Sequence, residues 1–531
     1  MSYTTVFSTL IAALALFYIT RRRSTIGNIV GPPSPSWIFG DFPSYSSWKK
    51  SMMVIVLGNM LQLLVSPQYG DYEFEWRRLY GSVYRIKGCL GPEFRLLAYF
   101  TSAEALERWT GECGDPRRYY QPSNCAMLLI IRCTGEDHRQ LRASLNLAFT
   151  AAAVRQYKPV FVKVAHSITE QLENSDVLSI DMCPLLSVAT LKSISEVVFG
   201  CPVEDLGADF IEHNTHIIQL TASQSASQVL FDMIAAHLPQ WLLHQAIHLP
   251  TKTFGALRAQ VHFAEREGWR LVREKTEGAK LGLETDGDLY GVLLNSVRSD
   301  SNSLREEDIV GQTSALMIAG QDTTANTLAF GLIELAKNPQ FQDSLRAEIH
   351  AAVGTGYNNI PYDSMPLLNA FIKESLRMYP AAVLSDRIAS EDMVIPLSES
   401  IATTTGERMN QIHISKGEFL TLATASYQRM ESRWGNDANK FRPTRWLDGT
   451  VYQGEALGPY ANLLSFHGGP RTCLGWRFAV FEMQVFLCEL VGKFSFSLPT
   501  GHSAEVRFAT TLLPTDSQGG KCALLCVKPI L

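Results

Sequence analysis

The chain has 531 residues and a formal net charge of −5, with 47 lysine and arginine residues against 52 aspartate and glutamate residues. This balance excludes the basic surface that nucleic-acid binding needs. Hydrophobic residues make up 46% and charged residues 19%, which excludes a disordered chain and permits a large core. The ten cysteines are too sparse for a disulfide scaffold, and no Cys-x-x-C motif favours a zinc site. We expect a globular protein of a reducing compartment.

The N-terminus carries an uncharged apolar run over residues 4–20, at the short end for a transmembrane helix. Arg21, Arg22 and Arg23 follow the run directly. A cleaved signal peptide carries its positive charge before the apolar run, whereas charge after it keeps the rest of the chain cytoplasmic. We therefore expect residues 1–23 to form a single-pass signal anchor. A buried N-terminal helix is the alternative.

Residues 24–69 are expected to connect the anchor to the rest of the chain. Gly31-Pro32-Pro33-Ser34-Pro35 is incompatible with helix and typical of a stiff hinge. A second apolar run, residues 52–65, is too short to span a membrane with any margin. It is a membrane-contacting segment, a buried helix or part of an insertion, and the sequence leaves all three open.

Residues 70–531 contain no linker, charge block or repeat, so we expect one domain. Residues 82–87 and 94–98 have the alternation and flanking glycines of a strand pair. Residues 306–336 lack proline and are apolar around most of a helical circumference, which predicts one long central helix. The chain is predicted to be mainly α with a small β component, with further helices at 138–149, 154–172 and 254–275 and further strands at 393–396, 419–423 and 522–527.

Cys473 lies in the segment Phe-His-Gly-Gly-Pro-Arg-Thr-Cys-Leu-Gly, directly before an apolar helix predicted over residues 476–491. A cysteine at the start of a helix receives amide hydrogen bonds and positive dipole potential, which stabilise a thiolate. Glycines beside it let a flat ligand approach the backbone. A phosphate-binding loop would need Gly-Lys-Ser/Thr, which is absent here. An inert buried cysteine is not excluded by the spacing alone.

The pattern Phe466-x-x-Gly469-x-Arg471-x-Cys473-x-Gly475 resembles the haem-binding loop of cytochromes P450, with every signature position filled. The resemblance covers residues 24–531, and the anchor and hinge are similar to those of microsomal, fungal-type members. It implies the cytochrome P450 fold, with a single catalytic domain behind an N-terminal membrane anchor. It also implies a haem b whose iron is bound by the thiolate of Cys473, with Phe466 and Arg471 in the binding loop.

The middle of the expected long helix reads Ala-Gly-Gln-Asp-Thr-Thr over residues 319–324. Glycine, acid and hydroxyl residues are poor choices there, because hydroxyls can bond back to preceding carbonyls and loosen the helix. Such local rule-breaking is expected at functional sites. The resemblance implies an oxygen-activation groove in which Gly320 makes room for dioxygen, Thr323 holds a water and Asp322 relays protons. An ordinary kinked core helix is the alternative.

Glu374 and Arg377 are three residues apart and therefore share one helical face. The spacing alone is unspecific, because Glu267 and Arg270 show it too. The resemblance selects the first pair and adds Arg445 of a Phe-Arg-Pro-Thr-Arg-Trp segment. Since guanidinium groups suit two-pronged contacts with carboxylates, we expect these three residues to form a buried charge network that supports the cysteine loop. Its role would be structural.

Four cationic or donor side chains match the family's propionate-binding positions. His138-x-x-x-Arg142 places both residues on one helical face, with histidine where the family often has tryptophan. Arg387 and Arg471 match two further positions. The alternative for any single arginine is an ordinary solvated surface residue.

The resemblance implies a monooxygenase that inserts one oxygen atom of O2 into a lipophilic substrate, a terpenoid or another secondary metabolite. Electrons would come from NADPH through a separate membrane-bound NADPH–cytochrome P450 reductase, since the chain has no nicotinamide or flavin fingerprint. The reductase would dock behind Cys473, where Arg139 and Arg477 contribute positive charge. The anchor would hold the enzyme in membrane lipid of the endoplasmic reticulum, with its catalytic domain in the cytoplasm.

Other functions remain open at this stage. A haem-thiolate isomerase or dehydratase would need no reductase, but such enzymes commonly lack the pair Asp322 and Thr323. A haem carrier would not need the weakened helix. A fatty-acid or xenobiotic hydroxylase differs only in its pocket, which we expect at residues 119–129, 209–250, 316–319 and 381–384. Residues 41–58 depart from the family pattern and are expected to be an insertion.

Overall fold

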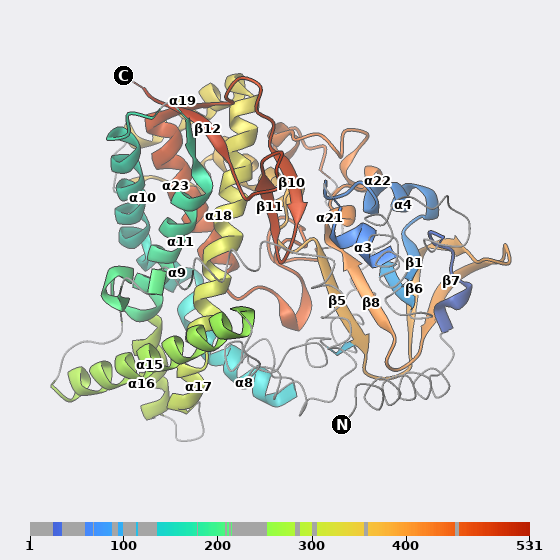
Figure 1. The fold of residues 1–531 in the computed structure, drawn as a ribbon, viewed down its shortest axis with the longest axis horizontal. Helices are drawn as coiled ribbons and strands as arrows, with labels where there is room; N and C mark the ends of the chain where they lie inside the picture. The colour runs from blue at the N-terminus through green and yellow to red at the C-terminus, as the bar shows by residue number, and fades with distance from the viewer. Residues whose placement is uncertain are drawn as a thin grey trace, which may run out of the picture.

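The computed structural model describes residues 25–33, 59–66, 68–87, 94–98, 113–114, 135–177, 179–207, 210–211, 214, 252–281, 287–299, 305–354, 359–451 and 456–530. Helices gather on one side of the molecule and most of the sheet on the other (Figure 1). The expected signal anchor, the expected insertion at 41–58 and the pocket segment 119–129 lie outside the described residues, as does most of 209–250.

Four helices form the core of the helical side. They are α10 (Lys158–Glu173), α11 (Met182–Phe199), α18 (Thr313–Lys337) and α23 (Trp476–Lys493). Helix α18 runs through the middle of the molecule beside α11, and α10 packs against both α11 and α23 (Figure 1). Helices α11 and α18 are apolar on nearly all sides, as expected of helices enclosed by others. The fold therefore places residues 319–324 of α18 at its centre.

One helix of the described residues, α11, has the length and mean hydropathy of a membrane span. In this structure 67% of its apolar window is buried within the protein. Its contacts with α10 and α18 explain why it is apolar all round.

The remaining helices surround this core. The helices expected at 138–149 and 254–275 are present, and the one expected at 154–172 is divided at Tyr157. The surrounding helices are α3 (Asn59–Leu64), α4 (Glu73–Tyr80), α8 (Gly135–Asn146), α9 (Ala151–Gln156), α15 (Lys252–Lys280), α16 (Leu289–Ser299), α17 (Glu306–Val310), α19 (Pro339–Gly354), α20 (Pro366–Met378), α21 (Thr424–Tyr427) and α22 (Glu431–Trp434).

The single helix expected over residues 306–336 is wrong at its start, because the structure has two helices there. Helix α17 ends after Val310, and α18 begins at Thr313. The amide of Gly311 donates to the carbonyls of both Glu307 and Ile309, and Gln312 donates to Ile309, so the helical hydrogen-bond pattern tightens into a turn. Glycine lowers the preference for continuing the α-helix at this point.

The largest sheet has the strand order β1-β2-β8-β5-β3. The expected strand pair is present as β1 (Val83–Lys87) and β2 (Phe94–Ala98), which run antiparallel. Strand β8 (Phe419–Ala423) joins β2 in parallel and β5 (Leu384–Ala389) antiparallel, and β3 (Cys113–Gly114) pairs with β5. The strand expected at 419–423 is β8, and all five of its residues are buried. This sheet carries Arg387 on β5.

Smaller sheets complete the fold. The C-terminal strand expected at 522–527 is β12, and it lies between β4 and β9. The strand expected at 393–396 is the first part of a longer hairpin strand, β6. The pairs are β6 (Met393–Ala402) with β7 (Arg408–Ile414), β10 (Glu505–Phe508) with β11 (Leu512–Thr515), and β4 (Ser179–Asp181) and β9 (Phe494–Ser497) with β12 (Leu524–Pro529).

The described parts of the expected connector, residues 25–33 and 59–66, pack on the main domain. Ile26 and Ile29 are buried in the cluster that includes the β6–β7 hairpin. The side-chain amide of Asn59 donates to the Pro33 carbonyl, and its oxygen accepts from the amide of Lys87 in β1. Apolar burial and partly buried hydrogen bonds thus join these segments to the sheet.

Candidate active site

The loop before α23 has a defined shape around Cys473. The Cys473 amide donates to the Phe466 carbonyl over 2.8 Å, which closes the loop. Gly469 has a φ of +65°, a conformation that favours glycine, and the Thr472 hydroxyl donates to its carbonyl over 2.7 Å. The Phe466 ring is buried and meets Tyr460 edge-on. Cys473 is thereby held just before Trp476, the first residue of α23.

Burial raises the pKa of the Cys473 thiol, and two groups act against this effect. They are the backbone amide of Gly475 and the positive charge of Arg142, both of which stabilise the thiolate. A coordinated metal ion deprotonates a thiol outright, because the charge of the ion stabilises the thiolate directly. Cys473 thus fits a thiolate ligand of an iron ion.

Positive charges converge beside this cysteine. Helix α8 carries His138 and Arg142 one turn apart. The pKa of His138, which is 8% exposed, is lowered to about 4 by burial and by the charges of Arg471 and Arg142. Histidine is therefore a neutral donor between two cations, and an anion placed there would relieve their repulsion. This donor set fits the carboxylates of a haem.

Arg387 approaches from a different element. It lies on β5, is 3% exposed, and its guanidinium donates to the adjacent Asp386 carbonyl over 2.8 Å. The structure thus brings His138, Arg142, Arg471 and Cys473 together, and the propionate role of Arg387 remains a prediction.

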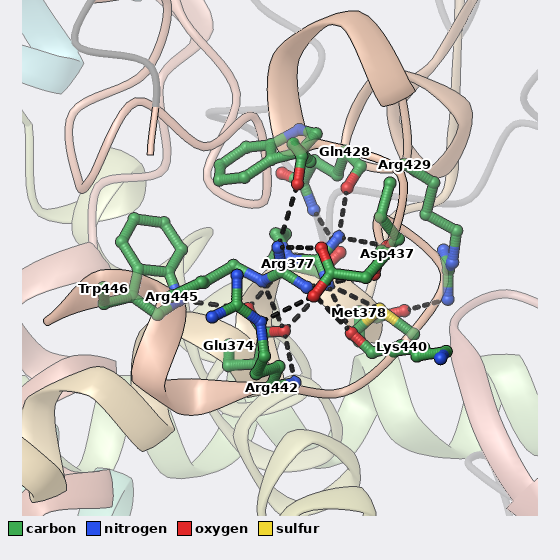
Figure 2. A network of polar contacts seen from close by, with 12 residues as sticks. Glu374, Arg377, Met378, Gln428, Arg429, Asp437, Lys440, Arg442, Arg445 and Trp446 are labelled. Atoms are coloured by element: carbon green, nitrogen blue, oxygen red, sulfur yellow. Dashed lines mark hydrogen bonds and ion pairs between the residues drawn. The ribbon is translucent and has the colours of Figure 1, made fainter. Parts of the chain in front are cut away.

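The charge network expected around Glu374 is present and fully buried (Figure 2). Arg377 donates from Nε and Nη2 to the two oxygens of Glu374, over 2.9 and 2.8 Å. Arg445 Nε donates to Oε1 over 3.0 Å and Trp446 Nε1 to Oε2 over 3.0 Å. The Arg442 amide adds a further bond over 2.7 Å. Every lone-pair direction of the buried carboxylate is thus met by a donor, as a buried charge requires.

Gln428, which sequence reasoning missed, connects this network to the cysteine loop. Its side-chain amide donates to the carbonyls of Leu376 and Arg377 at the end of α20. Its oxygen accepts from the amide of Leu464 and the hydroxyl of Ser465, just before Phe466. No local pattern marks a glutamine for this role, because its partners are distant in sequence.

Sequence reasoning also missed Asp437, whose carboxylate accepts hydrogen bonds from two arginines of the network. Arg445 Nη1 and Arg442 Nε donate to its carboxylate over 3.0 and 2.6 Å. The hydrogen bonds of these arginines lower the pKa of Asp437 and outweigh the opposing effect of burial. The two arginines in segment 442–446 are the sequence signal that predicts a carboxylate partner for this segment.

The centre of α18 packs closely against α11. A Cβ at Gly320 would lie 2.7 Å from Cγ1 of Ile194 in α11, so the missing side chain makes room for α11. The role expected of Gly320 in making room for dioxygen remains a prediction. The Thr323 hydroxyl donates to the Ala319 carbonyl over 3.0 Å, the back-bonding that the sequence predicted. Asp322 faces Ser187 and Lys521.

Comparison with known proteins identifies the class. The family model for cytochrome P450 matches residues 49–521. The chain belongs to the cytochrome P450 family. A ganoderic acid synthetase of Ganoderma lucidum is 31% identical over 68% of this chain and 72% of its own. Cytochrome P450 monooxygenase 219 of Postia placenta is 28% identical over 92% of both chains, and monooxygenase claO of Ampulloclitocybe clavipes is 28% identical over 90% of this chain and 88% of its own.

Membership in the cytochrome P450 family confirms the enzyme class that the loop around Cys473 predicted. The protein is an oxidoreductase, a cytochrome P450 monooxygenase. It implies a haem-thiolate cofactor, O2, an organic substrate and a redox partner. The mostly helical fold with small sheets agrees with the expected fold class.

Proposed function

We propose that the protein is a haem b monooxygenase in which the thiolate of Cys473 would bind the haem iron. The observation that carries this proposal is a partly buried cysteine beside a group of cations. Cys473 lies ahead of α23 with the Gly475 amide and Arg142 as its stabilising partners, and Arg142 shares its surroundings with His138 and Arg471. Bound haem would supply O2 binding and oxygen transfer to carbon.

The side chains of this chain have distinct roles in the proposal. His138, Arg142 and Arg471, with Arg387 as a fourth candidate, bind the haem propionates. Phe466 closes the loop that bears the ligand, with its buried ring against Tyr460. Glu374, Arg377 and Arg445 hold the segment that leads into this loop in place, through buried hydrogen bonds.

Thr323 and Asp322 of α18 would deliver protons in the proposed reaction. The Thr323 hydroxyl can hold a water beside the loosened turn, since its bond to the Ala319 carbonyl leaves its oxygen able to accept. Asp322 can exchange a proton with that water or with solvent. The overall reaction consumes O2, NADPH, a proton and the substrate, and yields the hydroxylated substrate, water and NADP+.

The substrate class, partner and location are also proposals. Leu316, Met317 and the turn before β5 are apolar, which supports a lipophilic substrate such as a terpenoid. The relative named for ganoderic acid synthesis supports a secondary metabolite. Arg139 and Arg477 would contribute to docking an NADPH–cytochrome P450 reductase. The apolar run at 4–20 followed by arginines supports anchoring in the endoplasmic reticulum membrane with the catalytic domain cytoplasmic.

The test of the ligand is Cys473→Ser. A hydroxyl is a far poorer ligand for iron than a thiolate, so the variant should lose the thiolate-type spectrum of the reduced, carbon-monoxide-bound protein. Cys526→Ser, which changes another cysteine that is neither fully buried nor paired, is the control and should keep it. Retention of the spectrum in Cys473→Ser would contradict the assignment.

The reaction itself is tested by adding the reductase, NADPH and a panel of one monoterpene, one sesquiterpene, one triterpene and dodecanoic acid. We expect NADPH consumption that depends on O2 and a hydroxylated product from a terpene. Product formation without NADPH or reductase would instead favour the isomerase alternative.

A further inference from the structure

A directed chain of buried hydrogen bonds ends on Asp322. The Gln260 side chain in α15 donates to Asn214 over 3.3 Å, and Asn214 donates to the side-chain oxygen of Gln321. Gln321 then donates to the Ser187 hydroxyl over 3.1 Å, and Ser187 donates to Oδ1 of Asp322 over 3.4 Å. Each donor in the chain points toward the carboxylate, which acts as the final acceptor. Gln260, Asn214 and Gln321 are buried.

Lys521 contacts the same carboxylate oxygen from the C-terminal segment. Its Nζ lies 2.6 Å from Oδ1 of Asp322, and the two side chains are 16% and 13% exposed. A surface ion pair contributes little to stability, whereas a pair so largely removed from water leaves an uncompensated charge when one partner is lost. Ser187 and Lys521 together therefore hold one oxygen of Asp322 and leave its second oxygen outside these two bonds.

Hydrogen bonds hold the backbone on both sides of Lys521. The Asp516 carboxylate accepts from the amide of Gly520 over 2.9 Å, which shapes the turn before Lys521. After it, the Ala523 amide donates to Asp181 over 2.8 Å. Asp181 is also the N-cap of α11, the helix that carries Ser187. Asp181 thus links the C-terminal segment that carries Lys521 to α11, the helix that carries Ser187.

Asp322 is adjacent to Thr323, about 100° further around α18. The Thr323 hydroxyl is bonded to the Ala319 carbonyl on its own side of the helix. A carboxylate that moved from Lys521 toward Thr323 would connect the partly exposed ion pair with the helical turn that carries Thr323. The strength with which Lys521 holds Asp322 would then determine how readily protons reach Thr323.

We propose that Lys521 is a positioning residue for the reaction, which holds the Asp322 carboxylate at the outer end of the proton route to Thr323. This inference rests on the proposed monooxygenase function. In the productive reaction one oxygen atom of O2 enters a C–H bond of the substrate, and the two electrons of NADPH with two protons convert the other oxygen atom to water. In the unproductive reaction the same two electrons and two protons convert O2 to hydrogen peroxide, and the substrate is unchanged. The ratio of these products reports on proton delivery.

The experiment compares Lys521→Gln with Lys521→Arg in the full-length holoenzyme with reductase, NADPH and the terpene that the wild type oxidises. Lys521→Gln removes the charge, and we expect product per NADPH to fall by about tenfold while hydrogen peroxide rises. Lys521→Arg restores a cation at this place and should recover most of the ratio. The carbon-monoxide spectrum should be unchanged in both.

Lys275→Gln is the matched control. Lys275 in α15 pairs over 2.5 Å with Asp288, the residue before α16, and the two side chains are 15% and 9% exposed. It breaks an ion pair of similar burial away from Asp322, so its product ratio should match the wild type. Equal losses in Lys275→Gln and Lys521→Gln would overturn the inference, as would a wild-type ratio in Lys521→Gln.

A second measurement does not depend on activity. In a double-mutant cycle of Asp322→Asn and Lys521→Gln, the two shifts in unfolding temperature should not add, because either change removes the same ion pair. Additive shifts would overturn the direct pairing. A wild-type protein without a thiolate-type spectrum would instead refute the proposed function, and the cycle would still report on the pair.

Discussion

Replacing Arg377 with alanine removes the best-connected cation of the buried network. Arg377 makes both bonds of a two-pronged contact with Glu374, and both side chains are fully buried. Its guanidinium also donates to the carbonyls of Gln428 and Ala438 over 2.7 Å each and of Lys440 over 3.0 Å. Alanine leaves these three acceptors and the carboxylate short of donors.

The expected loss in the free energy of unfolding is about 3–5 kcal/mol, the cost of breaking a buried ion pair by removing one partner. Arg445 and Trp446 still donate to Glu374, which keeps the loss from exceeding this range. Because whole domains are stable by only about 5–15 kcal/mol, the variant should yield little folded, haem-loaded protein. The assay is haem content per chain together with the unfolding midpoint in urea.

The control is Arg270→Ala, at the same spacing from Glu267 on α15. Arg270 donates to Glu267 over 2.7 Å, but its side chain is 34% exposed. Exposure screens the pair, so its loss should cost only about 0.2–1 kcal/mol. If Arg377→Ala and Arg270→Ala have the same haem content and the same unfolding midpoint, the argument that burial makes the Glu374 pair special is refuted.

Two further predictions concern the reaction and its pH dependence. Thr323→Ala should keep haem and the carbon-monoxide spectrum but release more hydrogen peroxide per NADPH, measured beside product formation; an unchanged ratio would mean that protons take another route. Glu482 in α23 is fully buried, and burial raises its pKa well above the ordinary 4.5. Because the folded state holds this proton more tightly than the unfolded state, wild-type stability should fall as the pH rises above 4.5. Glu482→Gln should therefore gain in relative unfolding temperature from pH 5 to pH 8, and a gap that does not change with pH would contradict a protonated Glu482.

The sequence by itself determined the family, because the residues around Cys473 depend on local geometry. A helix start, a glycine at positive φ and a cysteine between them are contiguous, so their spacing is visible without a fold. Local periodicity likewise predicted β1, β2 and most of the helical core. It failed at the α17–α18 break, where a tight turn keeps nearly helical hydrogen bonds and interrupts no apolar pattern.

Only the tertiary structure decided which polar groups meet across the chain. Gln428 joins α20 to the cysteine loop, and Lys521 reaches Asp322 from the C-terminal segment, although no nearby residue marks either one. Gly320 matches the family pattern, yet its contact with Ile194 depends on how closely α11 approaches α18. Burial and distance between remote segments set these interactions, and neither quantity is encoded in local spacing.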